Sequence, residues 1–281
     1  MNRSADAARK TGGRPGKARR SARLPRAIAA ILEDVAEPLR RLPEAKLGDP
    51  SPVLDAIAAL TKHLPESDGE PLETPWQVAA ISLLIQILTY LWRDRDDFYV
   101  GGNMFVYYST SRRRDRAFRG PDFYYVSGVE RHRPRDFWAV WEENARFPEV
   151  IVEFLSSTTA ETDRTTKKEL YEKTFRTDEY FCYDPDTHRL EGWRLHRERY
   201  RKITPDEHGR MWSKKLRLWL GNWTGEFHGL QEIWLRFYDA EGRLVLLEAE
   251  AERQRAQAAE EEVARLKALL ARKGGGRGTT P

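Results

Sequence analysis

Apolar residues recur at helical spacing in the segment that follows Glu73, Thr74 and Pro75. The three- and four-residue steps predict one buried face of an α-helix that ends near Trp92, formed by Val78, Ile81, Leu84, Ile85, Leu88 and Leu91. Thr74 has a hydroxyl that can cap the first turn, and Pro75 suits the first helical position. We expect the globular part of the chain to begin here, near Leu72.

Short runs of aromatic and β-branched residues follow this helix and predict β-strands. The runs cover residues 98–108, 123–126, 150–155, 180–183 and 190–195. Between the third and fourth runs, residues 162–175 have helical character, with Asp163 as a capping residue. An order of helix, strands, helix and strands predicts an α/β (α+β) domain with a mixed sheet, which we place at residues 71–240.

The two ends of the chain differ from this middle part. Residues 1–70 are basic at their start, which predicts a largely disordered extension that either contacts phosphates or only aids solubility. Residues 241–281 predict a coiled-coil-like helix with a seam of apolar residues at steps of three, four, three and four: Ala256, Ala259, Val263, Leu266 and Leu270. Its alanines bury little area, so a dimerising helix and a solvated single helix both agree with the sequence.

Composition narrows the cellular setting. The 281 residues carry a formal net charge of +4, which is compatible with a polyanionic partner. The single cysteine, Cys182, cannot form an internal disulfide framework or complete a structural zinc site, which favours a reducing, cytoplasmic location. No apolar run reaches the length of about 18 residues that a transmembrane helix needs, so no membrane association is expected.

Two carboxylates lie at or within predicted β-strands, where burial of a charge is unfavourable. Asp122 follows Pro121 directly before the strand at 123–126, and Glu153 lies within an apolar strand on the same face as Ile151. A buried carboxylate is costly unless it is paired, protonated or bound to a cation, and two of them on adjacent strands repel. Mg²⁺, or Mn²⁺ in its place, would remove this conflict, because it accepts a couple of carboxylates plus water and phosphate oxygens. The pattern therefore indicates a metal site at Asp122 and Glu153.

A lysine follows on the next predicted helix. Lys167 and Tyr171 are four residues apart and share a helical face, so this helix can direct the Lys167 amine at the end of the Glu153 strand. Two carboxylates, a metal and an amine are the components of phosphodiester hydrolysis, because the metal activates water and the amine stabilises developing charge. The structural alternative is a strand-capping Asp122, a Glu153 that pairs with an arginine, and a solvent-exposed Lys167.

Several motifs together resemble a known family. They lie at residues 99–108, 120–123, 141–143, 150–156, 179–181 and 184–185, with Asp163, Lys167 and Tyr171 at the family spacing. Through them, residues 74 to about 223 closely resemble the Uma-two endonucleases of the PD-(D/E)XK restriction-endonuclease-like superfamily.

The resemblance implies a mixed sheet of about four to five strands flanked by helices. It also implies a Mg²⁺-dependent endodeoxyribonuclease in which Asp122, Glu153 and the backbone carbonyl of Phe154 hold the metal. In the wider superfamily the catalytic lysine comes two residues after the second acid, where this chain has Leu155. In Uma-two proteins it has moved to the following helix, which matches Lys167; Lys168 would point about 100° away around the helix.

Basic loops flank the strand that follows Asp122, and we expect Arg119, Arg135 and Tyr171 to contact substrate. The arginines concerned are Arg112, Arg113, Arg114, Arg116 and Arg119 before the strand, and Arg131, Arg133 and Arg135 after it. The alternative is that they are solvated loop charges. The predicted substrate is DNA, although this chemistry reads only the phosphate and would also serve RNA. A homodimer through the nuclease domain or the C-terminal helix is compatible with the sequence. The alternative function is a non-catalytic nucleic-acid-binding or adaptor protein that retains the nuclease fold.

Overall fold

The helix predicted after Thr74 is present as α3 (Pro75–Leu91). The computed structural model describes residues 74–109, 118–156 and 159–274, so the extension predicted at 1–70 lies outside the described residues. The Gln77 N–H donates to the Thr74 hydroxyl at 3.2 Å, and the Thr74 N–H donates to the Gln77 side chain at 3.3 Å. This capping box fixes the start of the helix.

The buried face of α3 is shifted from the predicted one at both ends. Ile81, Leu84 and Leu88 are buried as predicted, whereas Val78 is 50% exposed and Leu91 is 37% exposed. Both predictions were wrong because α3 is buried mainly at its centre, where Ala79, Ala80, Leu83 and Ile87 join the core.

The main sheet has six strands in the order β1-β4-β6-β7-β8-β9. Its members are β1 (Phe98–Gly101), β4 (Phe123–Ser127), β6 (Val150–Phe154), β7 (Glu179–Asp184), β8 (Arg189–His196) and β9 (Arg199–Lys202). β6 and β7 are parallel and the other neighbours are antiparallel, so the sheet is mixed as predicted. β9 was not predicted, and it makes the sheet wider than the resemblance implied.

Two smaller sheets complete the body. One is antiparallel and contains β10 (Met211–Ser213), β11 (Leu218–Phe227) and β12 (Leu230–Tyr238). The other joins β3 (Phe118–Arg119), β2 (Val106–Tyr107) and β5 (Trp138–Ala139). The run predicted at 98–108 is therefore broken into β1 and β2 rather than continuous.

The second predicted helix is present, with two stretches of wider turns. It runs through α4 (Ala160–Thr162), the π-helical η2 (Asp163–Lys167), α5 (Lys168–Leu170) and the π-helical η3 (Tyr171–Phe175). It ends at Arg176, which has a left-handed backbone with φ of 55°. A regular α-helix drifts by about 40° for each four-residue step, and the wider π turns reduce that drift.

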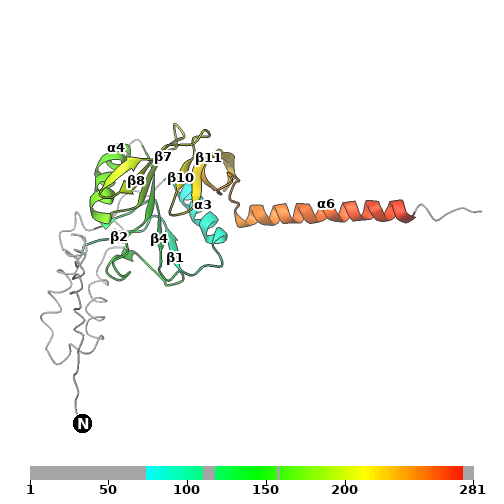
Figure 1. Cartoon of the computed structure of the whole chain (residues 1–281), viewed down its shortest axis with the longest axis horizontal. Helices are drawn as coiled ribbons and strands as arrows, with labels where there is room; N and C mark the ends of the chain where they lie inside the picture. The colour runs from blue at the N-terminus through cyan, green and yellow to red at the C-terminus, as the bar shows by residue number, and fades with distance from the viewer. Residues whose placement is uncertain (1–73, 110–117, 157–158, 275–281) are drawn as a thin grey trace, which may run out of the picture.

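Both faces of the main sheet are covered, as Figure 1 shows. On one face Phe123, Val152 and Phe181 pack with α3 and with the sheet formed by β10, β11 and β12. On the other face Tyr124 and Ile151 pack with the helical segment 160–175. The polar cluster described below lies between this second face and that helical segment.

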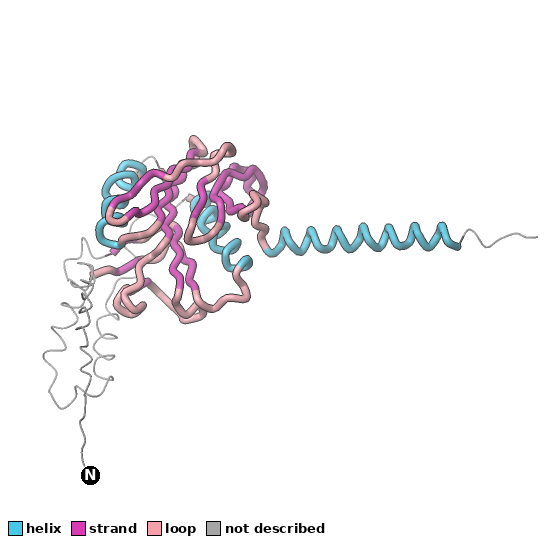
Figure 2. The backbone as a smooth tube through the Cα atoms, in the orientation of Figure 1, coloured by secondary structure: helices cyan, strands magenta, loops and turns pink. Residues whose placement is uncertain are grey.

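The C-terminal helix α6 (Glu248–Gly274) projects away from this body (Figures 1 and 2). Its presence agrees with the helix predicted for the C-terminal segment. Among the described residues, no helix combines the length and apolarity needed to cross a bilayer.

Candidate active site

Strand pairing brings the two predicted acids together. β4 and β6 pair with Phe123 opposite Val152 and Tyr124 opposite Ile151, so continuing this register places Asp122 opposite Glu153. Glu153 is fully buried, and Asp122 is half-buried at the start of β4. The two side chains and the two backbones are interlinked: the Phe154 N–H donates to Asp122 Oδ2 at 2.6 Å, and the Asp122 N–H donates to Glu153 Oε2 at 3.3 Å.

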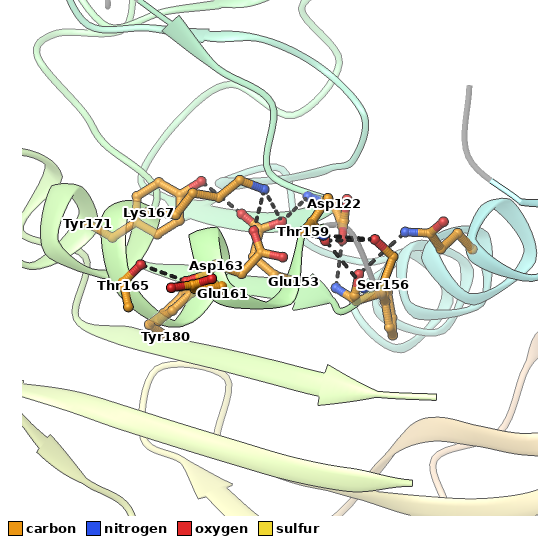
Figure 3. A network of polar contacts seen from close by, with 12 residues as sticks. Asp122, Glu153, Ser156, Thr159, Glu161, Asp163, Thr165, Lys167, Tyr171 and Tyr180 are labelled. Carbon is orange, nitrogen blue, oxygen red and sulfur yellow. Dashed lines mark hydrogen bonds and ion pairs between the residues drawn. The ribbon is translucent and has the colours of Figure 1, made fainter. Parts of the chain in front are cut away.

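The predicted lysine lies against the same acids. Lys167 Nζ is 3.2 Å from Glu153 Oε2 and 2.7 Å from Asp163 Oδ1, and its side chain is 19% exposed (Figure 3). The neighbouring Lys168 turns away, with its amine over the ring of Trp193 at 4.2 Å from the centroid. The structural alternative expected an arginine partner for Glu153 and a solvated Lys167. Among the described residues Glu153 has no arginine partner, and the Lys167 side chain is mostly buried.

Tyr171 contacts Glu153 rather than solvent. Its hydroxyl donates to Glu153 Oε1 at 2.8 Å and its side chain is completely buried. Asp163, Lys167 and Tyr171 are each four residues apart, and the π turns of η2 and η3 keep them on one face of the helical segment. Tyr180 closes the cluster from β7, because its hydroxyl donates to the Asp163 carbonyl at 2.9 Å. Tyr171 thus holds Glu153 in place and has no surface for direct contact with substrate.

The cluster holds more acid than base. Among the described residues, Lys167 is the only cation that forms an ion pair with Glu153 or Asp163. Burial, and then the charge of Glu153, raises the pKa of Asp122 well above its usual value. Burial also raises the pKa of Glu153, although the nearby Lys167 opposes that shift. Burial disfavours the charged form of Lys167, but the charges of Glu153, Asp163 and Asp122 outweigh it and raise the lysine pKa, so the amine stays protonated.

The Phe154 carbonyl is left available by a proline. In the continued register Pro121 lies opposite Phe154, and proline has no N–H to donate across the ladder. The carbonyl instead accepts the Gln77 side-chain amide from the first turn of α3, at a long 3.4 Å. Gln77 therefore links the start of α3 to the candidate site, a contact that sequence spacing could not reveal because the partners are 77 residues apart.

Gly102 lies between α3 and the backbone of Asp122. A Cβ at this position would be 2.4 Å from the Asp122 carbonyl oxygen and 2.4 Å from Cγ2 of Ile81. Both contacts are far shorter than packing allows, so only glycine permits this close approach. β1 ends at Gly101, and the chain then passes close to the Asp122 backbone at Gly102.

The predicted substrate-binding arginines have different surroundings. Arg119 is three residues before Asp122, half-buried, and its Nη1 donates to the Phe118 carbonyl at 2.7 Å. Arg135 is only 2% exposed and forms a two-bond pair with Glu143 at 2.8 and 3.0 Å. Its guanidinium also covers the rings of Tyr99 and Trp138. We leave Arg135 out of the proposed site because these contacts account for it as a packing residue.

The other predicted arginines divide into two groups. Arg112, Arg113, Arg114 and Arg116 lie outside the described residues. Arg131 donates to the carbonyls of Thr89, Trp92, Arg93 and Arg95 where α3 ends, and Arg133 pairs with Glu142. These two arginines stabilise loops.

The oxygen atoms of Asp122, Glu153 and the Phe154 carbonyl are few enough to fit a magnesium site in which water and substrate supply the other ligands. No group of three or more His, Cys, Asp or Glu side chains among the described residues is arranged to hold a metal. Two carboxylates and a carbonyl are nevertheless what Mg²⁺ commonly takes from a protein, the rest being water and phosphate oxygens. Here the carbonyl is that of Phe154, whose hydrogen bond from Gln77 is long. The residue that sequence reasoning missed is Asp163: it was expected to cap a helix, and its spacing from Lys167 could have indicated the ion pair.

Comparison with protein families gives the class of the protein first. A family model described as "Putative restriction endonuclease" matches residues 60–223, which is more than half of the chain. The protein is therefore of the nuclease class. More specifically, it belongs to the Uma2 family, which confirms the Uma-two resemblance seen in the sequence.

Comparison with individual proteins adds one similar structure. It is the crystal structure of a putative nuclease belonging to DUF820 from Anabaena variabilis, with 13% sequence identity and a TM-score of 0.40. The match covers 56% of this chain and 88% of that chain. No curated protein matches the chain.

Proposed function

We propose that this protein is a metal-dependent endonuclease that hydrolyses phosphodiester bonds of DNA. The observation that carries the proposal is the pair Asp122 and Glu153, which lie opposite each other and have raised pKa values. Within the part of the chain that the structure describes, a single lysine offsets their charge. Structural carboxylates are normally matched by cations and donors when buried. A divalent cation would compensate the remaining negative charge of Asp122 and Glu153.

The residues that would hold the ion are Asp122, Glu153 and the carbonyl of Phe154. Hard cations prefer oxygen ligands, and all three groups supply oxygen at one end of the strand pair. When bound, Mg²⁺ or Mn²⁺ supplies Lewis-acid polarisation of the phosphate and lowers the pKa of water. The Gln77 amide would have to release the Phe154 carbonyl, which its long hydrogen bond makes inexpensive.

The lysine supplies fixed positive charge beside the reacting phosphate. Lys167 stays protonated because the surrounding carboxylates raise its pKa, so it acts as a charge and hydrogen-bond donor and not as a base. Asp163 positions the amine through the 2.7 Å ion pair, and Tyr171 fixes Glu153. Arg119 is the remaining candidate for a phosphate contact, since it lies three residues from Asp122.

We assign these roles to a nuclease domain at residues 71–240, with the basic extension at 1–70 and the helical tail at 241–281 as additions to it. The one cysteine, Cys182, is buried and burial raises its pKa, so it is not a reactive thiol. The cytoplasmic location stays a prediction from the sequence.

One observation favours a second candidate, a non-catalytic nucleic-acid-binding or adaptor protein. Lys167 already forms ion pairs with Glu153 and Asp163, so the cluster has partial charge compensation without any metal. Metal binding separates the two candidates, because only the nuclease needs Asp122 and Glu153 to bind Mg²⁺ or Mn²⁺ together.

The test combines calorimetry with cleavage. Full-length protein is titrated with Mn²⁺ and then incubated with supercoiled plasmid, labelled single-stranded DNA and labelled RNA in Mg²⁺ or Mn²⁺. Asp122→Asn should lose both the binding heat and the cleavage, while Asp186→Asn, an exposed aspartate in the turn after β7, should keep both. Equal cleavage by wild type and Asp122→Asn would reject the assignment, and an absence of metal binding by wild type would favour the adaptor.

A further inference from the structure

The helix α6 is held firmly at its base and nowhere else. Arg236, fully buried on β12, forms a two-bond pair with Glu250 at 2.8 and 3.1 Å and also donates to the Val245 carbonyl at 2.8 Å. Arg255 adds a hydrogen bond to the Tyr90 hydroxyl of α3 at 3.0 Å. From Glu252 to Leu270 every described side chain is exposed (Figure 2). Apart from the hydrogen bond of Arg255, this part of the helix therefore has no partner among the described residues of its own body.

The exposed part carries an apolar stripe. Val263 is 49% exposed, Leu266 is 50% exposed and Leu270 is 69% exposed, and all three lie on the seam that Ala256 and Ala259 begin. Leu269, beside the seam, is 45% exposed. Helices in proteins gain most of their stability from packing an apolar face, and no residue that the structure describes covers this one.

The charges beside the stripe fit a second copy of the same helix. In a parallel coiled coil, the residue just before the first seam position of each heptad (position g) faces the residue five positions later on the other helix (position e). Three of the four such pairs in α6 have opposite charges: Glu248 with Arg253, Arg255 with Glu260, and Glu262 with Lys267. The fourth is Leu269 with Gly274 and carries no charge. Complementary charges at these positions set partner choice and orientation.

We propose that α6 pairs in parallel and in register with α6 of a second copy of this chain, as a two-stranded coiled coil. In register, Val263, Leu266 and Leu270 each meet their own counterparts, and the apolar ends lie together. A fully overlapping antiparallel pair of Glu248–Gly274 would instead place Leu270 against Glu252. A nucleic acid does not fit this helix, because it carries as many acidic as basic residues.

The seam also predicts how strong the pairing is. Ala256 and Ala259 bury little area, and Glu252 would face its own counterpart near the base of the helix. The association is therefore reversible and depends on concentration. Pairing in parallel puts both bodies at the same end of the coiled coil. This inference does not depend on the proposed chemistry, since it uses no residue of the candidate active site.

Light scattering over a concentration series tests the association itself. The full-length chain should shift from monomer to dimer mass as its concentration rises, and Leu266→Lys with Leu270→Lys should remain monomeric while circular dichroism shows the body intact. Glu262→Lys should raise the dissociation constant by roughly tenfold, because it turns two attractive pairs per dimer into repulsive ones. Adding Lys267→Glu to this variant should return the dissociation constant to the wild-type value, because the pairs again have opposite charges. A wild type that is monomeric at every concentration would overturn the proposal.

Disulfide trapping tests the direction. Leu266→Cys, oxidised with glutathione disulfide, should form a covalent dimer because the two thiols face each other in a parallel pair. Arg265→Cys, which lies outside the seam on the same turn, is the matched control and should not. The native Cys182 is buried and contributes no link. Equal trapping of both variants, or a link that forms only between Leu266→Cys and Ala256→Cys chains, would overturn the parallel arrangement.

Discussion

Two glutamates are buried on neighbouring strands of the main sheet, and their surroundings differ. Glu179, at the start of β7, receives Arg194 Nε at 2.7 Å and the Lys214 N–H at 2.9 Å on one oxygen. Its other oxygen accepts the Ser213 hydroxyl and the Lys215 N–H. Glu153, at the end of β6, has a lysine, a tyrosine and one N–H, with the carboxylate of Asp122 opposite it.

The difference separates a structural carboxylate from a candidate functional one. Glu179 has a full set of donors from its own chain, and these tie β7 to β8 and to the segment around β10. Glu153 shares one amine with other acids and keeps a raised pKa. Burial alone therefore does not mark a site; the mismatch between buried charge and available partners does.

The largest expected effect concerns the lysine beside Glu153. Lys167→Met should reduce cleavage by about 10²- to 10³-fold, because it removes a fixed donor beside the phosphate. Lys168→Met is the matched control, since that amine lies over Trp193 and should leave the rate nearly unchanged. Both rates are measured at saturating metal on the same plasmid. Similar losses in both variants would mean that Lys167 has no special role.

The second effect concerns Glu179, the glutamate with a full set of donors, and it is an effect on protein stability. Glu179→Gln should lower the free energy of unfolding by about 2 kcal/mol, because the amide turns an N–H toward groups that are all donors. Urea denaturation measures it, and Glu161→Gln on the exposed start of the helical segment serves as control. Cleavage per folded molecule should stay at the wild-type level. If Glu179→Gln lost cleavage without losing stability, Glu179 would be a functional carboxylate and not a structural one.

The third effect is smaller and has the opposite sign. Asp122→Asn should stabilise the metal-free protein by about 1 kcal/mol at pH 8, since it removes a carboxylate that must ionise beside Glu153. The sign follows from the raised pKa: the unfolded chain loses its proton first, so wild-type stability falls as pH rises through the unfolded value toward the folded one. Thermal melts at pH 5 and pH 8, with and without Mn²⁺, measure this. A variant that is less stable at pH 8 would contradict it.

The smallest effect tests the tyrosine. Tyr171→Phe should cost about 1 kcal/mol of stability, because Glu153 loses one of its donors while the ring packing is kept. Tyr180→Phe is a comparable control, since its hydroxyl donates to a backbone carbonyl and not to an acid. Only Tyr171→Phe should also weaken Mn²⁺ binding, which calorimetry can resolve.

The sequence predicts the elements whose pattern is local. Helix α3, the strands that carry Phe123 and Ile151, and the four-residue spacing of Lys167 and Tyr171 all follow from neighbouring residues. The adjacency of Asp122 and Glu153 depends on strand order, which the family resemblance implied and local pattern could not give.

What the sequence did not predict depends on distant contacts. Strands β11 and β12 bury Leu220, Trp234 and Phe237 but expose Glu226 and Gln231, so their apolar pattern is weak until the partner face is known. The pairing of Arg135 with Glu143 and the hydrogen bond from Gln77 to Phe154 are likewise products of the tertiary fold. The arginine-rich loops were therefore predicted to contact substrate, although Arg135 in one of them forms an ion pair within the protein.

Gly102 has a consequence for how mutations in this protein will be interpreted. An alanine there would displace the Asp122 backbone or part of α3, although residue 102 has no functional group. In a genetic screen for loss of activity, substitutions of Gly102 would then score as strongly as substitutions of the acids, although glycine has no reactive side chain. Loss of activity in a Gly102 variant that remains folded would indicate that Asp122 has been displaced. Partial rescue of such a variant by Ile81→Ala, which removes the Cγ2 atom that a Cβ at residue 102 would meet, would identify steric displacement as the cause.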